Sequence, residues 1–176
     1  AIILLFALAP YQAFGKSTKT YDGVSFSLPA TAYLAAVAGA GAAFVDDINS
    51  VNSNPAGLAN LKYNSVLLSH FSHFQDINLE YAALALPLPS ISADVAMDFS
   101  IFNSGNIDRY LIDWTIPDSP RPVNAGVYKN SDKTLGVYYA AKLFDNFNFG
   151  AGLKFINSKL DNISANAFRA NIGLQT

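Results

Sequence analysis

Three stretches in the second half of the sequence alternate between two kinds of side chain. In residues 134–143, 147–156 and 167–174 every second position is apolar, and most positions between carry glycine, small or polar residues. Successive side chains of a strand point to opposite faces, so this period of two predicts β-strands with one apolar face. The opposite face is rich in glycine and polar groups rather than uniformly charged, as in the lumen of a membrane barrel.

The predicted strands are long for a soluble protein. Further β-prone runs cover residues 63–74, 77–86 and 91–102, so about six strands are expected. They run about 10 to 12 residues, close to the roughly 9 to 11 with which a tilted strand crosses a bilayer. Strands of soluble proteins average about five or six.

The connections between these strands differ in length. Those at 87–90 and 145–146 are short and lie at one end of the predicted sheet, whereas 103–132 is a long loop and 157–162 a turn at the other end. Outer-membrane barrels have short periplasmic turns and longer extracellular loops. The connection near Gln75 is shorter than this pattern predicts for the extracellular side.

The composition favours a barrel and leaves one alternative open. Hydrophobic residues make up 51% of the 176-residue chain and charged residues 14%, below the roughly 25% of soluble domains. No apolar run approaches the roughly 20 residues of a membrane helix. A soluble, exported β-sandwich would also alternate in this way. The net charge of −2 gives no support for nucleic-acid binding, and the absence of cysteine excludes disulfides and thiolate metal sites.

The first residues are typical of an export signal. Residues 1–9 are continuously apolar, and Ala13 and Gly15 are small residues at the spacing of a cleavage site. Neither an initiator Met nor a basic segment precedes them, so residues 1–15 are interpreted as a signal peptide truncated at its start. The alternative is a buried first helix or strand.

No motif indicates catalysis, a cofactor or a metal site. Gly39 and Gly41 begin like a dinucleotide fingerprint, but Phe44 occupies the place of its third small residue. His70 and His73 fall on opposite faces of a predicted strand. Asp94 and Asp98 share a strand face, for which hydration inside a lumen or weak Ca²⁺ contacts are commoner roles than acid–base chemistry. We therefore expect no enzyme.

Residues 38–58 carry the most specific motif. A Gly/Ala-rich stretch leads through the pair Asp46 and Asp47 to Asn54-Pro55-Ala56-Gly57-Leu58, directly before the predicted strands. This order resembles the N-terminal hatch of the FadL superfamily of outer-membrane proteins, most closely its PorV/PorQ branch. Residues 157–168 are similar to the same branch, and the resemblance covers residues 38–176.

The resemblance implies an antiparallel transmembrane β-barrel of about fourteen strands. Residues 16–61 would be an irregular or short-helical hatch and residues 62–176 a partial barrel, so a fragment is expected. The candidate gating residues are those of the acidic pair and the motif: Asp46, Asp47, Asn54, Pro55, Ala56, Gly57 and Leu58. Small residues allow close packing inside a lumen, and the Asp and Asn side chains satisfy backbone groups there.

Two functions follow from the resemblance. The first is passive uptake of hydrophobic compounds such as long-chain fatty acids across the bacterial outer membrane. The second is a PorV-like role in protein secretion or in surface attachment of a protein cargo. The expected partners are outer-membrane lipid and either a hydrophobic small molecule or a secreted protein. In the long loop, four residues form a candidate extracellular capture surface, unless the loop packs into the lumen: Tyr110, Leu111, Ile112 and Trp114.

Overall fold

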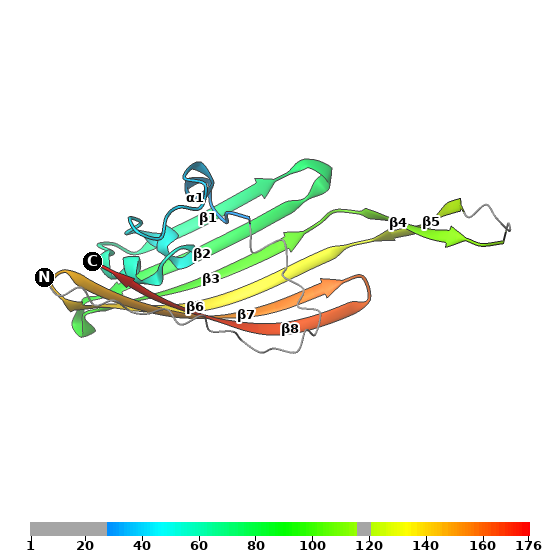
Figure 1. Ribbon diagram of the computed structural model, residues 1–176. Helices are drawn as coiled ribbons and strands as arrows, with labels where there is room; N and C mark the ends of the chain where they lie inside the picture. Colours follow the sequence, from blue (N-terminus) through cyan, green and yellow to red (C-terminus); the bar gives the residue numbers. More distant parts are fainter. Residues whose placement is uncertain (1–27, 116–120) are drawn as a thin grey trace, which may run out of the picture.

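The structure, a computed structural model, describes residues 28–115 and 121–176. Within them the chain forms a six-stranded antiparallel sheet in the order β1-β2-β3-β6-β7-β8 and a two-stranded hairpin, β4-β5 (Figure 1). The predicted all-β class is confirmed. The strands are β1 (Ser65–Ser72), β2 (Asn78–Leu88), β3 (Ala93–Asn103), β4 (Ile107–Asp113), β5 (Arg121–Tyr128), β6 (Asn130–Phe144), β7 (Phe147–Leu160) and β8 (Ile163–Gln175). The predicted signal peptide and residues 16–27 of the predicted hatch lie outside the described residues.

Short helices precede the sheet and join some of its strands. They are α1 (Ala32–Ala36) and the 3₁₀ helices η2 (Ile48–Asn52), η3 (Pro55–Asn60), η4 (Phe74–Asp76) and η5 (Pro89–Ile91). Asp47 is the N-cap of η2, and Asn54 is the N-cap of η3. Pro55 stands in the first turn of η3, where its missing N–H costs nothing. No helix in the described part of the chain is long and apolar enough to cross a membrane.

The two ends of the sheet differ. At one end η5 and the turn at 145–146 make short connections; we call this the turn end. At the other end lie η4, the β4-β5 hairpin and the β7-β8 turn; we call this the hairpin end. The predicted turn at 157–162 is wrong in extent, because Leu160 already pairs with Ile163. Asp161 adopts a positive φ of 55° between them, a conformation that Asp tolerates in tight turns.

The predicted long loop at 103–132 is mostly a β-hairpin. Figure 1 shows β4 and β5 continuing the line of β3 and β6 and projecting well beyond the sheet. The amide of Ser104 donates to the carbonyl of Asn130, which carries the pairing of β3 with β6 towards the hairpin. The sequence did not predict these strands, because the segment contains prolines. The pairing is also irregular, with a register shift between Asp108 and Tyr110. Pro122 is tolerated because β5 pairs on one side only among the described residues.

The two faces of the six-stranded sheet differ in what covers them. Residues 28–61, here called the N-terminal segment, lie against one face near the turn end (Figure 1). We call this the inner face and the opposite one the outer face. The protein core forms between the segment and the inner face. Its buried residues are Ile48, Val51, Leu58, Ala59, Tyr81, Ala83, Ala85, Ala96, Tyr138 and Ala140.

Candidate functional site

Asn54 joins the N-terminal segment to the sheet through hydrogen bonds. Its Oδ1 accepts the Ala56 amide at 3.2 Å and so caps η3. Its Nδ2 donates to two carbonyls, that of Ala42 at 2.9 Å and that of Leu174 on β8 at 3.0 Å. One amide side chain therefore satisfies backbone groups of the segment and of the strand together, a combination that only Asn or Gln offers.

Glycines on β7 and β8 make room for this contact. A Cβ on Gly150 would lie 2.3 Å from the Ala56 nitrogen, and one on Gly173 would lie 1.9 Å from Asn54 Oδ1. Any other residue at either position would push the segment away from the sheet. Pro55, Ala56, Gly57 and Leu58 are all buried at this contact. The motif predicted as a hatch thus packs directly on the inner face.

The acidic pair divides between two environments. Asp47 Oδ1 accepts the Asn49 amide at 2.8 Å and caps η2. Asn49 in turn accepts the Thr31 hydroxyl at 2.7 Å, which ties α1 to η2. Asp46 is exposed and lies beside a shallow hollow at the turn end. Of the pair, only Asp47 shapes the segment.

A buried ion pair lies further along the inner face. Lys154 Nζ on β7 contacts Asp98 Oδ2 on β3 at 2.7 Å, with the lysine side chain 11% exposed and the aspartate fully buried. Lys154 also donates to Asn52 Oδ1 of the N-terminal segment at 3.4 Å, and the Tyr138 hydroxyl donates to Asp98 at 3.3 Å. The cluster joins three strands to the segment through charged and polar contacts.

This cluster is not fully hydrogen bonded. The Tyr81 hydroxyl and Asn52 Nδ2 are buried without a hydrogen-bond partner in the described structure. Buried polar groups are rarely left so. At Asn54, by contrast, both the amide oxygen and the amide nitrogen are hydrogen bonded.

Part of this cluster could be predicted from the sequence. The pattern placed Asp94 and Asp98 on one strand face, and the structure confirms that both are buried on the inner face. Lys154 stood on the glycine-bearing face of its strand, but which lysine meets which aspartate depends on strand order. The alternation along each strand does not specify the order of the strands in the sheet, so the ion pair between Asp98 and Lys154 could not be predicted.

The outer face carries a continuous apolar band. Residues directly opposite one another in the sheet form rows, and most of their large apolar side chains are exposed. From the hairpin end the rows are Leu68, Ala82, Phe99, Leu135, Phe155, Phe168; Val66, Leu84, Met97, Val137, Leu153, Ala170; Leu86, Val95, Tyr139, Ala151, Ile172; and Leu88, Ala93, Ala141, Phe149, Leu174. On β7 the band runs from Phe147 to Phe155, as long as the roughly nine residues of a membrane-crossing strand.

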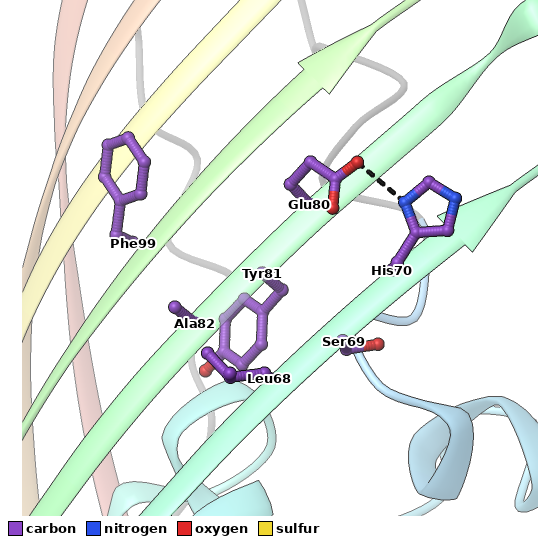
Figure 2. A pocket seen from close by; sticks show the side chains of 7 residues that line it. All are labelled: Leu68, Ser69, His70, Glu80, Tyr81, Ala82 and Phe99. Carbon is purple, nitrogen blue, oxygen red and sulfur yellow. Dashed lines mark hydrogen bonds and ion pairs between the residues drawn. The ribbon is translucent and has the colours of Figure 1, made fainter.

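The band ends abruptly towards the hairpin end. Figure 2 shows a shallow hollow in the outer face where Leu68 and Phe99 flank the small Ala82. One row further on, His70 Nδ1 and Glu80 Oε1 form an exposed pair at 2.6 Å. The outer face thus changes from apolar to charged within one row.

The hairpin presents the four predicted capture residues to solvent. Tyr110, Leu111 and Ile112 lie on β4 and Trp114 follows it; all four are more than half exposed. The hairpin is held at its base by an ion pair between Arg109 and Asp161 of the β7-β8 turn. At its other end the Thr115 amide donates to Asp113 and lowers the pKa of that carboxyl.

The candidate gating and capture residues are far apart in the fold. The gating residues lie at the turn end, and the β4-β5 hairpin with the capture residues projects beyond the hairpin end (Figure 1). Among residues 28–115 and 121–176, no three His, Cys, Asp or Glu side chains are grouped so as to hold a metal ion.

No protein-family model matches the sequence, and no curated protein matches it. The geometry of the two faces is therefore the basis on which a function can be proposed.

Proposed function

We propose that the chain is part of a bacterial outer-membrane β-barrel of the FadL type that takes up hydrophobic compounds such as long-chain fatty acids. In this proposal the outer face contacts lipid, the inner face lines a lumen, and the N-terminal segment is the hatch in it. The hairpin end faces the outside of the cell. About eight further strands of a roughly fourteen-stranded barrel would close the sheet between β8 and β1.

The apolar band on the outer face is the observation that carries the proposal. Side chains such as Leu68, Val137 and Ile172 are 78%, 55% and 77% exposed, and soluble proteins rarely expose large contiguous apolar surfaces. A β-sandwich would bury that face against a second sheet. Membrane barrels carry an apolar band about 25 Å tall with polar groups inside.

The inner face supports a gated lumen. Glycines on neighbouring strands keep the wall thin where the N-terminal segment packs, and the segment is attached to β8 through Asn54. The attachment is made of hydrogen bonds and short helices rather than of covalent links or continuous sheet. A segment attached in this way can shift while the sheet stays intact.

The test is binding of a labelled long-chain fatty acid to the whole protein in detergent or vesicles. We expect saturable binding that is weakened at least severalfold by Asn54→Ala, because the variant loses the η3 cap and both contacts of Nδ2. Asn64→Ala, at an exposed position before β1, is the matched control and should bind as the unaltered protein does. Absence of any fatty-acid binding by the unaltered protein contradicts the uptake proposal.

The projecting hairpin favours a second candidate, a PorV-like role in secretion or surface attachment of a protein cargo. Exposed aromatic and aliphatic side chains are common at the centre of protein interfaces. Replacement of Tyr110 and Trp114 by serine separates the two functions. Loss of cargo display on the cell surface with unchanged fatty-acid binding supports the second function, and the reverse result supports uptake.

A further inference from the structure

Beyond the apolar band, the outer face has two polar rows at the hairpin end, here called the polar rim. Each row continues the same face, because its members lie two residues beyond the preceding row on every strand. The rows are His70, Glu80, Ile101, Lys133, Asn157, Asn166; and Ser72, Asn78, Asn103, Ser131, Lys159, Ser164.

Lys133 on β6 and Lys159 on β7 are the two lysines of the rim. Lys133 lies opposite Asn157, and Lys159 is two residues further along the same strand. Diagonal neighbours of this kind are about 7–8 Å apart, and both lysines are exposed. Their ammonium groups can therefore reach a single anion from two strands.

Two carboxylates at the hairpin end form ion pairs with other residues. Glu80 pairs with His70 on β1 at the far side of the rim. Asp161, in the β7-β8 turn, pairs with Arg109. Asp132 belongs to the inner face and accepts a hydrogen bond from Ser158. The ion pairs that Glu80 and Asp161 make are therefore with His70 and Arg109 and not with the two lysines.

The neighbours of the lysines are hydrogen-bonding groups. Asn157 Nδ2 donates to Asn166 Oδ1 at 2.7 Å, which places two amide side chains side by side on β7 and β8. Ser131 and Ser164 flank Lys159 in its row. The next row towards the turn end is apolar at Leu135, Phe155 and Phe168, where the two rings lie 5.3 Å apart.

We infer that Lys133 and Lys159 form a binding site for the anionic phosphate headgroup of a membrane lipid. The lipid's acyl chains lie along the apolar band below, and its phosphate contacts the two ammonium groups. Asn157, Asn166 and the rim serines bind the remaining polar atoms of the headgroup. The occupant is a bilayer lipid rather than a soluble phosphate, because the site adjoins the apolar band and is open to it. This inference rests on the proposed function, in which the outer face contacts lipid.

The test uses the whole protein in nanodiscs that mix phosphatidylcholine with either phosphatidylglycerol or a phosphorylated glycolipid. Lipid retained by the protein is counted by native mass spectrometry. Each lysine near a membrane surface contributes about fivefold in affinity for anionic lipid. The double variant K133Q/K159Q should therefore retain the anionic lipid about 25-fold less well, and added salt should weaken binding to the unaltered protein.

The matched control is K62Q/K142Q, which removes the same charge away from the polar rim. Lys142 lies opposite Asn148, a buried residue of the inner face, and Lys62 precedes β1. The control should retain anionic lipid as the unaltered protein does. If K133Q/K159Q loses more of the glycolipid than of the phosphatidylglycerol, the sugar-bearing lipid is the ligand. If it loses both lipids equally, the site recognises the phosphate group that the two headgroups share.

Two other results would overturn the inference, and they differ in what they leave standing. If K133Q/K159Q inserts normally and retains anionic lipid as well as the unaltered protein, the lysines are not a lipid site, but the barrel proposal stands. If the unaltered protein enters neither kind of disc, the barrel proposal fails and the lipid site fails with it. Saturable binding of inorganic phosphate to the unaltered protein in detergent without lipid, lost in K133Q/K159Q, would contradict the choice of a lipid.

Discussion

At the scale of single residues, the ion pair between Asp98 and Lys154 places two opposite charges in the protein interior. Both charges are nearly or fully removed from solvent, and they contact each other at 2.7 Å. A buried pair adds little net stability over apolar residues of the same size, but removing one partner leaves an uncompensated buried charge. Stability is therefore expected to be kept only when both partners are replaced together by apolar residues.

We predict that Asp98→Ala lowers the free energy of unfolding by about 3–5 kcal/mol, because Lys154 is left buried and unpaired. The double variant Asp98→Leu/Lys154→Met should recover most of this loss. Urea unfolding of the whole protein in detergent or vesicles measures both. Equal losses for the single and the double variant would show that the pair is not coupled.

At the scale of elements, the N-terminal segment depends on what β7 and β8 lack. Gly150 and Gly173 leave the space that Pro55 and Asn54 occupy. The family resemblance in the sequence predicted a hatch that contains the motif from Asn54 to Leu58. It did not reveal the receiving surface, because glycines in a strand have several explanations until a partner backbone is seen next to them.

We predict that Gly150→Val displaces the N-terminal segment while leaving the sheet intact. The added side chain meets the Pro55 and Ala56 backbone, which cannot move aside as a flexible side chain does. Limited proteolysis should then cut within residues 40–60 at least tenfold faster. Ala151→Val, on the outer face of the same strand, is the control and should keep the original rate. Unchanged cleavage of the Gly150 variant would show that the segment is held elsewhere.

The β4-β5 hairpin is the element that the sequence predicted least well. Its composition, with prolines near the tip, predicted a long loop, and its strands are irregular in register. A two-stranded hairpin without a third strand buries little apolar surface. Its strands therefore need no regular alternation of apolar and polar residues, and such strands are hard to recognise in a sequence. In contrast, β6, β7 and β8 are bordered by different surroundings on their two faces, and their pattern was evident.

At the scale of the whole molecule, the apolar band fixes how the sheet must be oriented if it is in a bilayer. The sequence predicted the two faces, because these follow from alternation along each strand. It did not predict the strand lengths: β1 has 8 residues and β6, β7 and β8 have 15, 14 and 13, against the roughly 10 to 12 expected. It could not predict how the rows of different strands align, since register is set by pairing between strands. Only the aligned rows show that the band is continuous and has a sharp border at the polar rim.

We predict that an arginine placed in the middle of the band is much more costly than one at its border. Leu153→Arg should lower the free energy of unfolding from vesicles by about 2–4 kcal/mol, whereas Asn157→Arg, in the polar rim of the same strand, should cost about 0–1 kcal/mol. Denaturant titrations in lipid vesicles measure both variants. Equal costs for the two positions would contradict a lipid-facing outer face.

The contact between Asn54 and Leu174 also sets an order of events during folding. These residues are 120 positions apart, and Gln175 reaches the Val45 carbonyl across 130 positions. Closing loops of that length is slow and is rewarded only once the distant partner is in place. The N-terminal segment, which is synthesised before the strands, can therefore complete its contacts with the sheet only after β8 has joined it.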